Sequence, residues 1–394
     1  MPLLTINNDS RGFPMTQAMI NPDILSWARQ RAGLDVHALA RKLNVDEEKL
    51  VSWEQGGVRP TFKQAQNYAH NTHVPFGYLF LKQPPRDELP IPDLRTVGDH
   101  STLEISINLR DVIRDVFQRQ LWYQEYQTER GADPVVVVGS LSVLTPVHTI
   151  VAEMKTHLGL KPWPERGNWE DYARDLIDRI ESLGILVMRN GMVGSNTHRL
   201  LSIDEFRGFA IADRIAPVIF INTADCPEAR LFTLIHELTH IWLGESGISD
   251  ADPRSQRQVE QLCNAVAAEF LAPEDEFNAH WQTDTDNWKA NLPGLSSHFH
   301  VSQWVIARRA MELDLITGSE YWSYVKKLQA DYKAREKNGA PPYNRIQTGR
   351  VSKRLAQAVA SEALSGRMLL RDAWQLIGIK PDKLAAYARK ELKI

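Results

Sequence analysis

The chain has only two cysteines in 394 residues, which excludes a small scaffold held together by disulfides. It has no apolar run near the roughly 20 residues that cross a bilayer. Its first residues lack the basic and then apolar pattern of a signal peptide. The formal net charge is −3, so the whole molecule has no bulk attraction to nucleic acid or to anionic membranes. We therefore expect a cytoplasmic protein with no membrane partner.

Residues 21–82 predict a bundle of short helices. Asn21-Pro22-Asp23, Asp35 and Thr61 are typical helix starts. Other positions complete a pattern: Leu25 with Ala28-Arg29, Leu39-Ala40, Leu43-Asn44-Val45, Trp53-Glu54-Gln55-Gly56 and Arg59-Pro60-Thr61. With these residues the segment resembles the helix-turn-helix of the XRE (Cro/phage-repressor) class.

The predicted recognition helix of this segment begins with Asp46-Glu47-Glu48. In a helix-turn-helix this end faces base edges and phosphates, which three carboxylates would repel. Acidic residues also suit any helix N-terminus, because they complement the helix dipole. Two alternatives stay open: DNA binding, with Lys49, Ser52 and Arg59 as the contacting residues, or recognition of a protein partner, including a second copy of the chain in a homodimer.

The middle of the chain predicts a small sheet. Residues 185–188 form an apolar run typical of a buried strand, and the β-rich runs 207–212 and 217–222 flank a polar turn. The two runs predict an antiparallel hairpin whose edge strand could pair with an extended substrate. Helices are expected over 104–130, 145–160, 168–183 and 293–316, and from 350 to the end. A proline-rich connector is expected over 84–92 and a flexible linker over 333–344.

Chemistry is indicated by the sequence His236-Glu237-Leu238-Thr239-His240. On a helix, positions i and i+4 share one face, so His236 and His240 can bind the same metal ion. Glu237 lies beside that face, where it could act as a general base. The alternative is a helix with two partly exposed histidines, but the apolar flanks predict a buried helix, and buried histidines need partners.

Glu260 follows His240 by twenty positions and offers a third ligand. Two imidazoles and one carboxylate leave one tetrahedral position open, which is typical of a catalytic zinc site. This spacing is that of the gluzincin peptidases. The segment resembles the ImmA/IrrE family of metallo-endopeptidases more closely, through residues 207–209, 217–222, 230–240, Glu260 with Cys263-Asn264, and 267–273.

The resemblance implies that His236, His240 and Glu260 bind Zn²⁺ and that Glu237 is the general base. Asn264, one turn beyond Glu260, could orient a ligand, or it could simply bond to backbone. Cys263 is interpreted as a core residue. His280, His298 and His300 have no spacing that supports a role in the site.

Together the two resemblances predict an α+β protein, mainly helical, built as an XRE-ImmA/IrrE fusion. The expected domains are a flexible tail (1–20), a helix-turn-helix (21–82), a connector with a long helix (83–130), a zincin-like peptidase domain with a small antiparallel sheet (131–325), and a linker with a C-terminal helical region (326–394). The resemblance implies a zinc endopeptidase that cleaves a repressor-like regulator during a stress or phage response. The alternative is a DNA-binding regulator, or an antitoxin-like partner of a toxin, with a structural or weakly active metal site.

Overall fold

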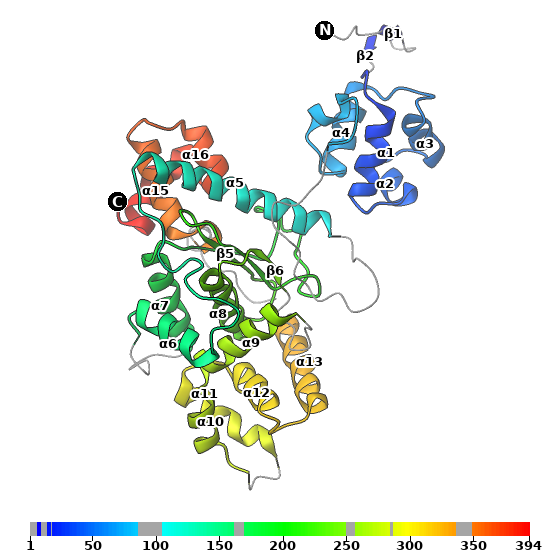
Figure 1. Cartoon of the computed structure of the whole chain (residues 1–394). Helices are drawn as coiled ribbons and strands as arrows, with labels where there is room; N and C mark the ends of the chain where they lie inside the picture. The colour runs from blue at the N-terminus through cyan, green and yellow to red at the C-terminus, as the bar shows by residue number, and fades with distance from the viewer. Residues whose placement is uncertain are drawn as a thin grey trace. The chain divides into compact units, whose positions relative to one another are not determined.

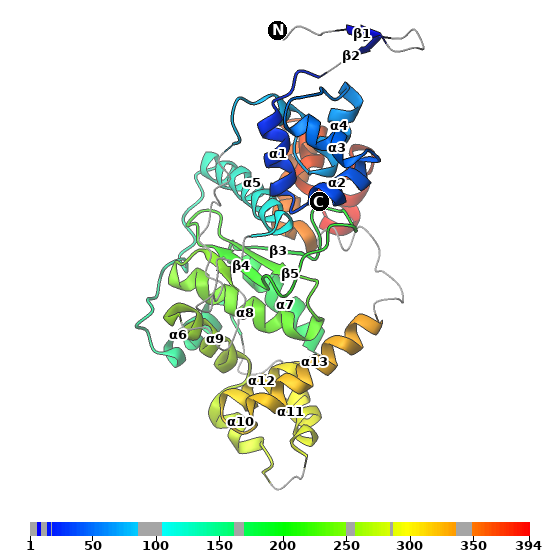
Figure 2. The same ribbon diagram turned by 90° about the vertical axis from the view of Figure 1, so that its right-hand side faces the viewer.

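The computed structural model describes residues 6–8, 14–16, 18–85, 105–160, 169–249, 257–283, 287–335 and 349–394. These residues belong to two compact units. The first contains the described residues up to 85 together with 105–110, and the second contains those from 111 to 394. Figures 1 and 2 show the two units from two directions.

The first unit is a bundle of four short helices. Its elements are α1 (Pro22–Arg31), α2 (Val36–Leu43), α3 (Glu47–Glu54), α4 (Phe62–Asn71) and a 3₁₀ turn at Phe76–Phe80. Asn21, Asp35 and Thr61 each cap a helix with their side chains, because the first backbone N–H groups of a helix have no partner within it. These are the helix starts that the sequence predicts.

A buried ion pair holds the bundle together. Arg29 donates to both carboxylate oxygens of Glu54, and the Tyr68 hydroxyl donates to the same carboxylate at 2.8 Å. Leu50 and Trp53 of α3 are buried in the core of the bundle. Ahead of the bundle, β1 (Ile6–Asn8) pairs antiparallel with β2 (Pro14–Thr16). This short pairing lies within the expected tail of residues 1–20, and three residues a strand leave no apolar alternation to detect.

The second unit contains a four-stranded mixed sheet in the order β3-β5-β4-β6. Its strands are β3 (Leu186–Asn190), β4 (Gly208–Ile211), β5 (Val218–Asn222) and β6 (Gly247–Ser249). The predicted hairpin is confirmed as the antiparallel pair of β4 and β5. The predicted purely antiparallel sheet is wrong, because β3 runs parallel to β5. An apolar run such as 185–188 carries no signal for the direction in which it will pair.

Helices make up most of the second unit, so the prediction of a mainly helical α+β protein agrees with the structure. Its helices are α5 (Ile107–Glu129, of which the part from Asp111 belongs here), α6 (Val147–His157), α7 (Trp169–Ser182), α8 (Pro227–Leu243), α9 (Gln258–Leu271), α10 (Glu274–His280), α11 (Asn291–Phe299), α12 (Gln303–Glu312), α13 (Gly318–Arg335), α15 (Lys353–Leu364), α16 (Leu370–Ile377) and α17 (Leu384–Tyr387). The predicted connector and linker fall largely on residues 86–104 and 336–348, outside the described residues.

The sheet separates two layers of side chains. Ala210 and Ile219 face α8 and belong to the main core. Phe209 and Phe220, which are partners across β4 and β5, point to the opposite face and stack with ring centroids 4.9 Å apart. In both views α5 lies on the side of the sheet away from α8 (Figures 1 and 2). Helix α8 therefore packs against one face of the sheet, through contacts with β4 and β5.

Among the described residues, no helix combines the length and the apolar character that spanning a membrane would require.

Candidate metal centre

Helix α8 positions the two histidines of the His-Glu-x-x-His motif. It begins with a proline at its first position and ends at Gly244, which adopts the left-handed conformation with φ 72°. The carbonyls of Ile241 and Trp242 near its C-terminus accept hydrogen bonds from the backbone of residues 139 and 141. The helical spacing then places the His236 and His240 rings side by side, with their Nε2 atoms 3.3 Å apart.

Helix α9 packs against α8 and brings the Glu260 carboxylate to both rings. Glu260 Oε2 lies 3.2 Å from His236 Nε2, and Oε1 lies 3.2 Å from His240 Nε2. All three side chains are fully buried. The structure therefore brings together the three ligands that the sequence predicts, although they come from two helices.

The geometry of this triad fits a metal ion. Two atoms that bind one tetrahedral zinc ion at about 2.05 Å are about 3.3 Å apart. The two histidine Nε2 atoms are 3.3 Å apart, and each lies 3.2 Å from a different oxygen of Glu260. Both Glu260 oxygens are buried and neither accepts a hydrogen bond of good geometry. A buried carboxylate without donors is costly unless a cation compensates it. The triad is thus a suitable cation site.

The charge states of the triad point the same way. Burial alone would raise the pKa of the Glu260 carboxyl, but contact with the two histidines outweighs burial and lowers that pKa to about 2. Burial lowers the pKa of His236, despite the opposing effect of Glu260. Glu260 is therefore in the carboxylate form, which is the form that binds zinc.

Cys263, which the sequence analysis interprets as a core residue, lies close to both histidines. Its Sγ and the ligand atoms of His236 and His240 all lie within 4.8 Å of one another. Burial raises the pKa of the thiol well above its usual value, with Glu260 acting in the same direction. A bound metal ion can remove the proton of such a thiol, so Glu260 and Cys263 are both candidates for a position beside the two histidines.

Glu237 contacts the sheet. Its Oε1 accepts a short hydrogen bond from the Ser249 hydroxyl of β6. Gly208 of β4 lies so close that a Cβ there would be 2.7 Å from the same oxygen. The carboxylate of the predicted general base is thus fully buried between α8 and the strands β4 and β6.

Asn264 contacts a predicted metal ligand directly. Its Oδ1 lies 3.1 Å from His236 Nδ1, and it also accepts a hydrogen bond of 2.9 Å from Nη2 of Arg308 in α12. The sequence suggested a contact by Asn264 because it lies one turn beyond Glu260. Arg308 and Ser249 were not suggested, because their proximity depends on the packing of α12 and on the pairing of β6, for which the sequence carries no signal.

Strand β6 occupies the edge of the sheet beside the site. It pairs antiparallel with β4, with Ser249 opposite Gly208 and Ile248 opposite Phe209. Both edges of β4 are therefore taken, one by β5 and one by β6. The prediction that the 207–222 hairpin offers a free edge to a substrate is wrong for this conformation, because three residues that follow α8 occupy that edge.

The three histidines without a predicted role do not reach the triad. His280 and His298 stack with ring centroids 4.2 Å apart, and His298 contacts Glu276 at 2.7 Å. This cluster between α10 and α11 is partly exposed. His300 ends α11 in the left-handed conformation.

Around α3 of the first unit, the residues predicted to contact DNA lie at or near the surface. Lys49 and Arg59 are exposed and Ser52 is partly buried. Glu47, at the start of α3, pairs with His37 at 2.7 Å. DNA binding through these residues stays a prediction, and so does the alternative of a protein partner.

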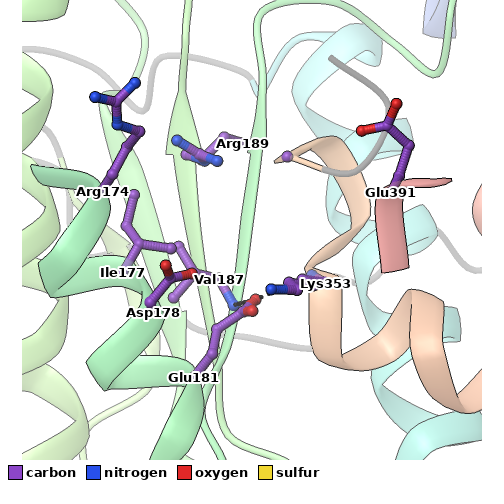
Figure 3. A pocket seen from close by; sticks show the side chains of 9 residues that line it. Arg174, Ile177, Asp178, Glu181, Val187, Arg189, Lys353 and Glu391 are labelled. Atoms are coloured by element: carbon purple, nitrogen blue, oxygen red, sulfur yellow. Dashed lines mark hydrogen bonds between the residues drawn. The ribbon is translucent and has the colours of Figure 1, made fainter. Parts of the chain in front are cut away.

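A separate cavity of about 190 Å³ lies between α7, β3 and the C-terminal helices (Figure 3). Arg174 and Asp178 of α7 line one side, Arg189 of β3 lies behind them, and Lys353 and Glu391 line the other side. Glu181 at its base accepts hydrogen bonds from backbone N–H groups, and burial raises the pKa of its carboxyl. The lining contains none of the metal-binding motif, so the chemistry we assign to this chain lies elsewhere.

Comparison with known proteins agrees with the class of site described here. A family model of the IrrE N-terminal-like domain matches residues 180–311, which run from the end of α7 to α12. This range contains the triad, Glu237, Ser249, Asn264 and Arg308. A second model, of a domain of unknown function (DUF8813), matches residues 351–390.

The relative found among characterised proteins is the radiation response metalloprotease IrrE of Deinococcus radiodurans. It is 47% identical to this chain over 64 residues, which is 14% of this chain and 20% of the relative. The match thus spans about a fifth of that protein's length. The peptidase-like part of the resemblance seen in the sequence is supported by these findings, and neither family model covers the N-terminal bundle.

Proposed function

We propose that the chain is a zinc-dependent endopeptidase that regulates a stress or phage response by cutting a repressor-like protein at one site. The observation that carries the proposal is the buried cluster of His236, His240 and Glu260, in which the two Nε2 atoms lie 3.3 Å apart and each lies 3.2 Å from a Glu260 oxygen. Three protein ligands leave a fourth position open, as in catalytic zinc sites. The match to the IrrE N-terminal-like domain over residues 180–311 supports the same class.

The proposed reaction is the hydrolysis of a peptide bond. When bound, zinc would supply Lewis acidity, because it polarises a carbonyl and lowers the pKa of a water molecule towards neutrality. Glu237 takes one proton from the attacking water as the new C–O bond forms. It gives that proton to the leaving nitrogen as the C–N bond breaks. A carboxylate can do this only in its ionised form, and the Ser249 hydroxyl that donates to Oε1 leaves the second oxygen, Oε2, able to accept the proton.

Substrate entry requires a change at the sheet edge, since the triad and Glu237 are fully buried. We infer that β6 leaves β4 and that an extended stretch of substrate takes its place. The backbone positions of β4 that now pair with β6, at Gly208, Phe209 and Ala210, would then pair with the substrate backbone. The same movement would withdraw Ser249 from Glu237.

Two variants test the chemistry. Glu237→Gln should bind zinc as the unchanged protein does and should lose cleavage, because an amide cannot take the proton. His236→Ala should lose both. Cleavage is measured by incubating the purified chain and zinc with the product of a neighbouring gene that encodes a repressor-like or toxin-like protein, and by looking for a discrete fragment. Full activity in Glu237→Gln would exclude this mechanism.

A second function is favoured by the position of Cys263. If its Sγ completed a four-ligand site with the triad, the metal would be structural. The chain would then be a binding regulator, or an antitoxin-like partner of a toxin, that acts without Glu237. Cys263→Ala separates the two functions. The peptidase should keep its zinc and its activity, whereas a structural site should lose zinc and much of its thermal stability.

A further inference from the structure

Arg308 is a buried cation next to the metal centre, and its surroundings are built around it. It lies in α12 and is 2% exposed. Its guanidinium carbon lies 3.6 Å from the centroid of the Phe232 ring of α8, and its Nε donates to Glu312 at 2.9 Å. Stacking and ion pairing fix the plane of the guanidinium, so its Nη2 points in one direction, towards Asn264.

This direction determines how the Asn264 amide faces. A guanidinium only donates hydrogen bonds, so the atom of Asn264 that lies 2.9 Å from Nη2 must be the oxygen. The oxygen and nitrogen of an amide are otherwise hard to distinguish. The same oxygen lies 3.1 Å from His236 Nδ1. One acceptor atom therefore serves both Arg308 and the histidine.

The facing oxygen in turn determines the tautomer of His236. An amide oxygen only accepts, so Nδ1 must carry the proton. The lone pair is then on Nε2, the atom that faces His240 and Glu260. If the amide turned over, its NH₂ would favour a proton on Nε2, and the ring could not bind a metal there.

His240 provides an internal contrast. Among the described residues its Nδ1 has no hydrogen-bond partner, although the ring is fully buried. The tautomer of His240 is therefore not set by a neighbouring side chain of the described chain. The network that starts at Arg308 acts on His236 alone.

We propose that Arg308 is a positioning residue for the metal centre, which holds the Asn264 oxygen towards His236 and so keeps His236 Nε2 available to bind zinc. This inference rests on the proposed zinc site. It extends that site to a third helix, because α12 contributes no metal ligand but determines the tautomer of His236.

The test compares zinc affinity in two backgrounds. In the unchanged background, Arg308→Met removes the donor that selects the Asn264 oxygen, and zinc affinity should fall by about 10- to 100-fold, as is usual when the partner of a metal-binding histidine is lost. In the Asn264→Asp background both side-chain oxygens accept, so no orientation needs to be chosen. There Arg308→Met should lower zinc affinity by less than about threefold.

Zinc affinity is measured on the full chain by competition with a chromophoric chelator, and the melting temperature of the metal-free protein is recorded alongside. The matched control is Arg309→Met. Arg309 is the next residue of α12, is 6% exposed, and pairs with Glu269 rather than with Asn264. This control should lower the melting temperature and leave zinc affinity unchanged.

An equal loss of zinc affinity in both backgrounds would overturn the proposal, because Arg308 would then act through packing. No loss in either background would overturn it as well. If Arg308→Met does not fold, Arg308→Gln takes its place, since a glutamine amide can accept as well as donate and no longer dictates how Asn264 faces. Failure of the unchanged protein to bind zinc would instead count against the proposed function.

Discussion

Replacing Gly208 by alanine is expected to disable Glu237 while leaving the metal ligands in place. A Cβ at this position would lie 2.7 Å from Glu237 Oε1, and 2.9 Å from both Glu237 Cγ and the Phe220 carbonyl oxygen. Ordinary contacts begin near 3.4 Å. The carboxylate would therefore have to move by about 0.7 Å, the difference between 3.4 and 2.7 Å. The Phe220 backbone, which is fixed by the sheet, limits any compensating shift of β4.

The magnitude follows from this displacement. Misplacing a reacting group by about 1 Å costs about 100-fold in rate, so Gly208→Ala should reduce turnover by about 10- to 100-fold. Overpacking of this kind also costs about 1–3 kcal/mol of stability. Zinc content should not change, because Gly208 contacts none of the three ligands. The measurements are turnover with the cleaved partner, zinc by elemental analysis, and the melting temperature.

The matched control is Gly294→Ala in α11, where a Cβ meets nothing within 4 Å. It should leave turnover unchanged and stabilise the helix slightly, by roughly 0.5–1 kcal/mol. Full turnover in Gly208→Ala would refute the placement of Glu237 against β4. Loss of zinc in this variant would also refute the reasoning, since the clash would then extend to the ligands.

Two further predictions concern the closed strand and the buried histidine. Ile248→Ala removes a fully buried side chain from β6, which should weaken the closed conformation and raise turnover at low substrate concentration several-fold; a fall in turnover with zinc retained would show that β6 does not restrict entry. In the metal-free protein the pKa of His236 is lower in the folded state than in the unfolded state. As pH decreases, the histidine therefore takes up a proton first in the unfolded state. The free energy of unfolding should fall below about pH 6.5, by up to about 1.4 kcal/mol per pH unit. Glu260 adds its own loss only below about 4.5, as pH falls towards its lowered pKa of about 2. Burial raises the pKa values of Glu181 and Asp115, whose protonation opposes this loss as pH falls, so urea unfolding between about pH 6.5 and 4.5 identifies the histidine by comparison with a variant. His236→Gln should flatten this slope, and His148→Gln, at an exposed position of α6, should not.

The parts of the site that the sequence predicts are those that local spacing determines. His236 and His240 share a helix face because they are four residues apart, and Glu260 follows from the spacing of the family that the segment resembles. The helix starts at Asn21, Asp35 and Thr61 are similarly local, since a capping side chain and its backbone partners are two or three residues apart.

The parts that the sequence misses depend on which elements meet. Arg308 is 44 residues from Asn264, and its neighbour Arg309 looks the same in the sequence and pairs elsewhere. In the sequence Gly208 is indistinguishable from any other strand residue, and its close approach to the Glu237 carboxylate is known only from the structure. Cys263 was interpreted as core from its apolar surroundings, and burial is correct, but its distance from the histidines appears only once α9 packs against α8.

The pairing of β6 with β4 has a consequence for selectivity. A strand that belongs to the same chain is a tethered competitor, whose effective concentration at its own edge reaches the millimolar range for short connections. An arriving peptide must outcompete it, and its apparent affinity is divided by the fraction of molecules in which the edge is free. If that fraction were about 1%, the apparent dissociation constant of the peptide would be about 100-fold higher. Random unfolded segments would be turned away, and only a partner held by further contacts could displace three rungs of sheet. On the proposed function, β6 would thus restrict cleavage to such a partner.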